Sequence, residues 1–122
     1  MAQEAPVGAV LVVGGGIGGI QAAIDLADAG IKVYLAEERS AIGGRMAQLD
    51  KTFPTNDCAM CIVSPKLVHV GRHPDIEVLT RTKVEAVFGS PGHFRVKLHR
   101  APRYVDIDKC TACGDCATAC PV

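Results

Sequence analysis

The sequence predicts an α/β fold that begins with a βαβ unit, and three observations support that prediction. Val7 to Val13 is a short apolar run ending in glycines, which is typical of a buried parallel strand. Ile17 to Ala29 follows with apolar residues at helical spacing, and Gly30 is expected to end this helix as a C-cap residue. Ile31 to Ala36 alternates apolar side chains and predicts a second strand. The helical face consists of Ile20, Ala23, Ile24 and Ala27.

The middle of the chain, residues 39 to 75, gives weaker signals. Met46 to Phe53 is expected to form a short helix that Pro54 ends, and Pro65 to Val70 is expected to form another helical turn. Ile76 to Thr80 then predicts a third strand.

Two more strands precede a change in composition. Lys83 to Phe88 and His93 to His99 are expected to pair as a hairpin, because Gly89-Ser90-Pro91-Gly92 between them is a turn signal. From residue 101 the pattern of strands gives way to a cysteine-rich stretch. We therefore expect a domain over residues 1–100, with a small β-meander, and a separate segment over residues 101–122.

Composition and charge exclude several classes of function. The 122 residues carry 13 basic and 13 acidic side chains, which gives no electrostatic case for a nucleic-acid partner or an acidic membrane surface. No apolar run approaches the ~20 residues that a membrane span needs. Met1 to Pro6 has no basic cluster and does not resemble a secretory signal. The cysteines fall into tight C-x2-C groups, which indicates metal or redox chemistry in the cytoplasm.

The glycines after the first strand form the pattern G-x-G-x-x-G at Gly14, Gly16 and Gly19, with Gly18 inside it. Gly14 permits a tight turn, Gly16 lets the backbone approach a pyrophosphate, and Gly19 lets the helix and strand pack closely. The helix N-terminus would then face the phosphate charge. The alternative is a glycine-rich turn that binds no ligand.

An acidic residue and a second glycine loop extend this dinucleotide pattern. Glu37 ends the second strand about 20 residues after the loop, where a carboxylate can accept hydrogen bonds from a ribose. Gly44 and Arg45 follow it and resemble the second contact of FAD-binding oxidoreductases, and we add Val84 to the predicted cofactor contacts. FAD is therefore favoured over NAD, while an ordinary surface loop with a solvated arginine remains the alternative.

The end of the chain reads C-x2-C-x2-C-x3-C-P, with Cys110, Cys113, Cys116 and Cys120. This is the spacing of bacterial ferredoxins that bind [4Fe–4S] clusters. Zinc is the alternative, although zinc sites usually pair two C-x2-C knuckles across a longer loop. The predicted fold is therefore a Rossmann-like FAD-binding βαβ unit with a β-meander, followed by a partial ferredoxin-type segment. In two-cluster ferredoxins the fourth cysteine binds the other cluster, so we expect the chain to be the front piece of a longer protein.

Cys58 and Cys61 form a separate C-x2-C pair with three possible roles. The two thiols could be cluster ligands, which is the role we favour, a redox dithiol beside the flavin, or buried structural residues. Asp57 disfavours a fast-attacking thiolate slightly, because a negative charge opposes thiolate formation.

The histidines show no ligand spacing with a second histidine or an acid on a predicted helix. Each is expected to be a surface or strand residue, and Asp25 and Asp28 are expected to be solvated on the first helix. No Ser-His-Asp or paired-carboxylate pattern supports hydrolytic chemistry.

A specific set of segments runs through the chain: Gly14 to Gly19, Ile42 to Pro54, Asp57 to Cys61, Ser64 to Lys66, Val70 to Pro74 and Pro102 to Asp106. Together they strongly resemble the HdrA family of heterodisulfide reductase subunits, with its related polyferredoxins. The resemblance implies an FAD domain like that of thioredoxin reductase, interrupted by an inserted ferredoxin domain. It implies an oxidoreductase subunit that passes electrons between FAD and [4Fe–4S] clusters, with no catalytic residue for the heterodisulfide itself in this chain.

The same resemblance implies partners: other heterodisulfide reductase-type subunits, a hydrogenase or formate dehydrogenase, and ferredoxin. Two rival hypotheses are a folded fragment that binds neither cofactor and a zinc-stabilised nucleotide-binding module without redox activity.

Overall fold

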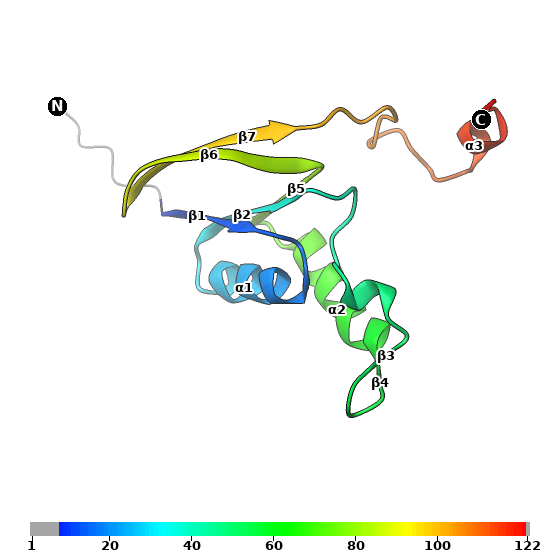
Figure 1. Ribbon diagram of the computed structural model, residues 1–122, viewed down its shortest axis with the longest axis horizontal. Coiled ribbons are helices and arrows are strands. Elements are labelled where there is room, and N and C mark those ends of the chain that lie inside the picture. The colour runs from blue at the N-terminus through cyan, green and yellow to red at the C-terminus, as the bar shows by residue number, and fades with distance from the viewer. Residues whose placement is uncertain (1–7, 122) are drawn as a thin grey trace.

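Three parallel strands form the sheet at the centre of the molecule, in the order β1-β2-β5 (Figure 1). In this computed structural model, which describes residues 8–121, they span Ala9–Val13, Lys32–Glu37 and Ile76–Thr80. All three strands lie where the sequence predicts them. The predicted start of the first strand at Val7 lies outside the described residues, as does the Met1 to Pro6 opening.

β1 is not the buried strand that its composition predicts. Within the described residues it pairs with β2 alone, where Val10 lies beside Val33, and so it forms an edge of the sheet. Val13 is 65% exposed, whereas Val33 and Leu35 in the central strand β2 are fully buried. An apolar run indicates a strand of a parallel sheet, but its place in the strand order depends on pairing between distant segments.

The first helix, α1 (Ile17–Asp28), packs against one face of the sheet (Figure 1). Its predicted apolar face is confirmed, because Ile20, Ala23, Ile24 and Ala27 are all buried. Gly30 ends the helix as predicted: it has a φ of +84°, and its N–H donates to the Ala27 carbonyl at 2.9 Å.

The second helix, α2 (Ala59–Arg72), lies beside α1 on the same face and is much longer than the predicted turn (Figure 1). It continues through Pro65, although proline cannot donate the usual helical hydrogen bond. Val63 and Val70 are buried, with Val70 in the core that α1 and the sheet share. Burial of this face offsets the missing hydrogen bond, so tertiary packing overrides the local signal of proline.

The predicted helix from Met46 to Phe53 is wrong beyond its first turn. Only the 3-10 helix η1 (Met46–Gln48) forms, and the chain then makes a small antiparallel pair of strands. These strands are β3 (Lys51–Thr52) and β4 (Asp57–Cys58), and β4 leads directly into α2.

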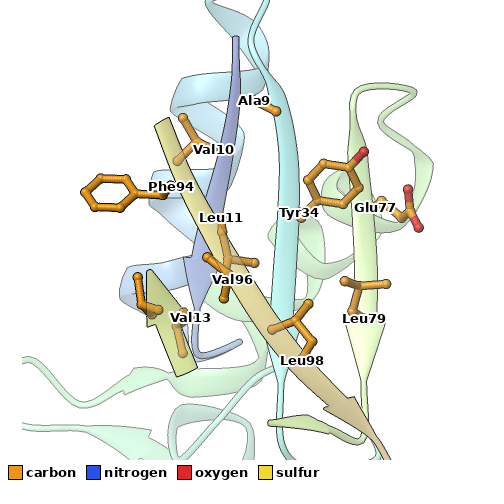
Figure 2. Close-up of a pocket in the computed structure, with 11 residues that line it drawn as sticks. Ala9, Val10, Leu11, Val13, Tyr34, Glu77, Leu79, Phe94, Val96 and Leu98 are labelled. Carbon is orange, nitrogen blue, oxygen red and sulfur yellow. The ribbon is translucent and has the colours of Figure 1, made fainter. Parts of the chain in front are cut away.

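The predicted hairpin is confirmed as β6 (Thr82–Ser90) and β7 (His93–Arg100), which form a two-stranded antiparallel sheet. It lies over the face of the parallel sheet opposite α1, and Figure 2 shows β7 crossing β1 and β2. Between the two sheets is a cavity of about 770 Å³. Most of its walls are apolar side chains, including Leu11, Val13, Leu79, Val96 and Leu98. This cavity includes no residue of the glycine loop.

The C-terminal segment leaves the sheet after β7 and stands apart from it (Figure 1). An Arg103 Nη2 hydrogen bond to the Ser40 carbonyl, at 3.3 Å, fixes its start. From residue 102 to residue 121 every side chain is exposed, and the short helix α3 (Asp115–Thr118) is the segment's one helix within the described residues. No described helix is both long and apolar enough to cross a bilayer.

Candidate cofactor sites

The glycine loop makes the tight turn that its sequence predicts. Gly14 has a φ of +103°, a left-handed conformation that side chains disfavour, and its N–H donates to the Ala36 carbonyl at 2.8 Å. A Cβ at Gly19 would lie 1.9 Å from the Gly14 carbonyl oxygen. Only glycine at position 19 therefore allows α1 to approach the end of β1 so closely.

The N-terminus of α1 offers main-chain donors to an anion. Gly16 is its N-cap residue, with no side-chain cap and no acidic residue in the first turn. A Cβ added at Gly16 or at Gly18 would meet no atom within 4 Å. The first N–H groups of a helix lack intrahelical acceptors and carry partial positive charge, so this open space fits a phosphate group.

Glu37 joins the end of β2 to the glycine loop. One carboxylate oxygen accepts the Gly15 N–H at 2.7 Å, and the other accepts the Arg39 N–H at 2.8 Å. A carboxylate has about four lone-pair sites, so these two bonds leave room for the ribose hydroxyl donors of a nucleotide.

The second glycine loop packs directly on the first. Gly43 donates its N–H to the Gly15 carbonyl at 2.7 Å, and a Cβ at Gly44 would lie 2.8 Å from Gly16 Cα. Arg45 follows at the start of η1 with its side chain exposed, and it forms no ion pair among residues 8–121. Its guanidinium is therefore available to a ligand beside the loop.

Val84 lies at the same end of the sheet, on the half-buried side of β6. The start of β6 is held beside the end of β2 by the Arg81 N–H, which donates to the Arg39 carbonyl at 2.9 Å, and by a Lys83–Glu38 ion pair at 3.5 Å. A contact between Val84 and the cofactor stays a prediction.

These features fit the ADP half of a dinucleotide such as FAD. The two glycine loops, the uncapped helix and the free lone pairs of Glu37 converge at the carboxyl end of the parallel strands, where ligands of open α/β sheets bind.

The four cysteines of the C-terminal segment are all free and exposed. Ala112 and Gly114 have φ values of +56° and +88°, and they bend the chain between successive cysteines. Small residues and accessible thiols fit an iron–sulfur cluster, whose ligands are deprotonated cysteines.

Cys58 and Cys61 are joined in a disulfide, and both are exposed. The predicted alternative that they are buried structural residues is therefore wrong. In this oxidised form neither sulfur is available to a metal. Their assignment as cluster ligands stays a prediction.

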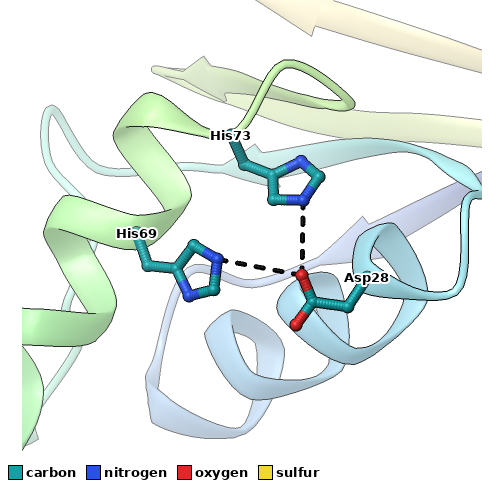
Figure 3. A group of neighbouring side chains, drawn as sticks. All are labelled: Asp28, His69 and His73. Carbon is teal, nitrogen blue, oxygen red and sulfur yellow. Dashed lines mark ion pairs between the residues drawn. The ribbon is translucent and has the colours of Figure 1, made fainter.

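Sequence reasoning missed a side-chain cluster between the two helices, which Figure 3 shows. His69 and His73 lie one turn apart at the end of α2, and their Nε2 atoms are 3.8 and 3.4 Å from Asp28 Oδ1. The prediction that the histidines lack ligand spacing is therefore wrong, because the length of α2 was not predicted. Asp28 is exposed on α1, as predicted, and it also faces these two histidines. The sequence did contain a signal for the longer helix, because the apolar residues Ala59, Val63 and Val70 are spaced so that they fall on one helical face.

The hydrogen bonds of this cluster favour a link between helices over a metal site. His73 Nδ1 accepts the Asp75 N–H at 3.1 Å, which places the proton of a neutral ring on Nε2. That Nε2–H then points to Asp28, so it is a donor to the carboxylate and not a free metal ligand.

Comparison with known proteins identifies both cofactors. A family model described as FAD dependent oxidoreductase matches residues 9–59, and one described as 4Fe-4S binding domain matches residues 103–122. These matches confirm FAD and a [4Fe–4S] cluster as the cofactors. In structure the chain is similar to T. acidophilum thioredoxin reductase, with a TM-score of 0.61, 18% identity, and coverage of 75% of this chain and 30% of that one. This likeness supports the predicted fold.

Two curated relatives, both HdrA-type subunits, cover nearly the whole chain. An iron-sulfur subunit of CoB–CoM heterodisulfide reductase from Methanopyrus kandleri is 59% identical over 92% of this chain. The corresponding subunit of the H(2)/formate:CoB-CoM heterodisulfide,ferredoxin reductase from Methanococcus maripaludis is 55% identical over 92%. The chain spans only 17% of the length of each relative. Because it is 59% identical to one of these relatives over 92% of its own length, the chain belongs to the HdrA family of heterodisulfide reductase subunits.

Proposed function

We propose that this chain is an electron-transfer part of a heterodisulfide reductase-type oxidoreductase, passing electrons between FAD and [4Fe–4S] clusters. One observation supports the proposal: the same short chain combines a glycine loop whose geometry fits a dinucleotide with a run of free cysteines at ferredoxin spacing. Residues 1–100 then form the N-terminal part of the FAD domain, and residues 101–122 form the start of a ferredoxin-type segment. The end of β7 at Arg100 supports this division.

Different residues of the chain bind different parts of FAD and the iron–sulfur cluster. The main chain at Gly14, Gly16, Gly18 and Gly19 holds the pyrophosphate, and Glu37 accepts the ribose hydroxyls. Gly44 lets the second loop approach, while Arg45 and Val84 supply further cofactor contacts. Cys110, Cys113, Cys116 and Cys120 are the cluster ligands. When bound, FAD exchanges electrons singly or in pairs and the cluster exchanges them singly, so together they connect two-electron donors to one-electron carriers.

The name of the Methanococcus maripaludis relative includes hydrogen, formate and ferredoxin. We propose corresponding partners for the parent of this chain: other heterodisulfide reductase-type subunits, a hydrogenase or formate dehydrogenase, and ferredoxin. Exposed free thiols also support a cytoplasmic location, where cysteines stay reduced.

Anaerobic reconstitution with iron, sulfide and FAD tests the proposal. We expect flavin absorption bands together with a broad iron–sulfur absorption that bleaches on reduction, and iron, sulfide and flavin in the purified protein. A protein that takes up zinc alone, or none of these components, would contradict the proposal and favour the zinc-stabilised module or the inert fragment.

Gly16→Ala separates a ligand role from a packing role. Because Gly16 has a φ of −77° and its added Cβ meets no protein atom, we expect the stability of the FAD-free chain to be unchanged. The methyl group would occupy the space of the pyrophosphate, so FAD affinity should fall about tenfold or more. Equilibrium dialysis with FAD and thermal unfolding measure the two effects. Gly71→Ala, at another open position, is the control, and equal affinities in the two variants would refute the phosphate site.

Glu37→Ala tests the ribose contact. Loss of charged hydrogen bonds worth about 1.5–3 kcal/mol should weaken FAD binding roughly 10- to 100-fold. Glu38→Ala is a matched control, since Glu38 is exposed and pairs with Lys83. In an FAD titration, Glu38→Ala should bind FAD with the affinity of the unmodified chain. An unchanged FAD affinity in Glu37→Ala would contradict the role of Glu37 in binding the ribose.

A further inference from the structure

The cysteine-bearing segment begins beside the proposed ribose site, and one side chain attaches it there. Thr80, the last residue of β5, lies opposite Glu37 in the β2–β5 register, and Ser40 lies in the loop that follows β2. Arg103 Nη2 donates to the Ser40 carbonyl at 3.3 Å and also to the Thr80 hydroxyl. A single guanidinium from the start of the segment therefore joins the ends of β2 and β5.

Main-chain hydrogen bonds connect Glu37 to the same point. The Arg39 N–H donates to the Glu37 carboxylate at 2.8 Å, and the Arg39 carbonyl accepts the Arg81 N–H at 2.9 Å. The Arg81 carbonyl in turn accepts the Ala101 N–H at 2.8 Å. The carboxylate that would hold the ribose and the residue at which the segment begins thus belong to one hydrogen-bonded set.

Arg103 is the one side chain in residues 102–121 that hydrogen-bonds to an earlier part of the described chain. Between Arg103 and the first cluster cysteine the chain forms a turn of its own. The Asp106 carbonyl accepts the Cys110 N–H at 2.9 Å, and Asp106 Oδ1 accepts the Asp108 N–H at 3.1 Å. Because this turn limits the freedom of the connection, an anchor at position 103 also restrains the position of Cys110.

Arginine is well suited to this anchor. Its planar guanidinium stays charged and carries five donors, so one group can hold two acceptors in a fixed arrangement. Both acceptors are uncharged oxygens from different strand ends. Pro102 precedes Arg103, and its ring restricts φ to about −65°, which removes a further rotation between the sheet and the anchor.

We propose that Arg103 is a positioning residue for electron transfer: it holds the start of the cysteine-bearing segment beside the ADP site, so that the iron–sulfur cluster stays at a defined distance from FAD. This inference rests on the proposed function, because it concerns single electrons passing between those two cofactors. Arg103 itself neither gains nor loses an electron. A segment released from the sheet would spend little time at the productive separation, and the transfer would slow.

The anchor is tested first in the cofactor-free chain, by 15N relaxation under reducing conditions. In Arg103→Ala the order parameters of residues 104–110 should fall by about 0.2 or more, while those of β2 and β5 stay unchanged. Arg103→Lys keeps the charge and three donors but not the planar fork, so it should restore part of the order. Arg100→Ala is the matched control, since Arg100 is exposed at the end of β7 and forms no ion pair among residues 8–121.

The effect on electron transfer is measured in the chain reconstituted with FAD and the cluster. A light pulse reduces FAD with oxalate as the electron donor, and electron paramagnetic resonance of rapidly frozen samples follows the appearance of the reduced cluster. Arg103→Ala should keep its iron content and FAD affinity but reduce the cluster about tenfold more slowly or less. Arg103→Lys should recover part of the rate, and Arg100→Ala should match the unmodified chain.

Unchanged order parameters in Arg103→Ala, or an unchanged rate of cluster reduction, would overturn the proposal. A slower rate accompanied by loss of iron or of FAD affinity would also overturn it, because Arg103 would then serve the cofactor sites themselves. If the unmodified chain binds both cofactors but passes no electron between them, the proposed function fails and this inference fails with it. The relaxation experiment separates that outcome from a failure of the anchor alone, because it requires neither cofactor.

Discussion

Gly19→Ala is expected to destabilise the fold more than any other change in the glycine loop. Its Cβ would lie 1.9 Å from the Gly14 carbonyl oxygen, and the clash is with backbone, which no rotamer change relieves. α1 would have to move away from β1, at a cost of about 3 kcal/mol or more, which lowers the midpoint of thermal unfolding by roughly 10 °C. Circular dichroism during heating measures this shift.

Gly18→Ala is the matched control for that experiment. It adds the same methyl group to the neighbouring residue of the same helix, where no atom lies within 4 Å. Alanine is the better helix former by ~1 kcal/mol, so the stability of the FAD-free chain should hold or rise. If Gly19→Ala unfolded at the same temperature as Gly18→Ala, the close approach of helix and strand would be refuted.

Cys113→Ser is expected to abolish the iron–sulfur cluster. A serine hydroxyl stays protonated near neutral pH and does not replace a thiolate, so bound iron and acid-labile sulfide should fall close to zero. FAD affinity should be unchanged, because the C-terminal segment is exposed and stands apart from the sheet (Figure 1). Iron and sulfide analysis, with visible absorption, measures the first effect, and FAD titration measures the second.

Thr111→Ala in the same segment is the control, since it leaves every cysteine in place. It should keep the iron content of the unmodified chain. Full iron in Cys113→Ser would contradict the ligand assignment, whereas joint loss of iron and FAD would contradict the independence of the two sites.

The dinucleotide site could be predicted closely because its requirements are local. Gly14 needs a left-handed turn, and Gly19 needs room beside that turn, so both appear directly as residue types at fixed spacing. What the pattern did not reveal is how Glu37 is used. Its carboxylate binds Gly15 N–H across 22 residues, and that bond exists only because β1 and β2 lie side by side.

The central part of the chain was predicted poorly for the opposite reason. Pro65 indicates a break by its own chemistry, yet α2 runs through it because Val63 and Val70 are buried against the rest of the molecule. Once that helix is recognised, His69 and His73 come to one side of it and face Asp28. A residue's neighbours along the chain carry no information on such a contact.

The sequence by itself determined the βαβ unit, the glycine loop with Glu37, and the spacing of the C-terminal cysteines. Each of these depends on periodicity or on the stereochemistry of a few adjacent residues. Only the tertiary structure decided that β2 and not β1 is central, that Gly44 packs on Gly16, and that Cys58 caps a helix with Lys51 opposite. Those features depend on which distant segments pack together, and packing follows from the burial of the whole chain.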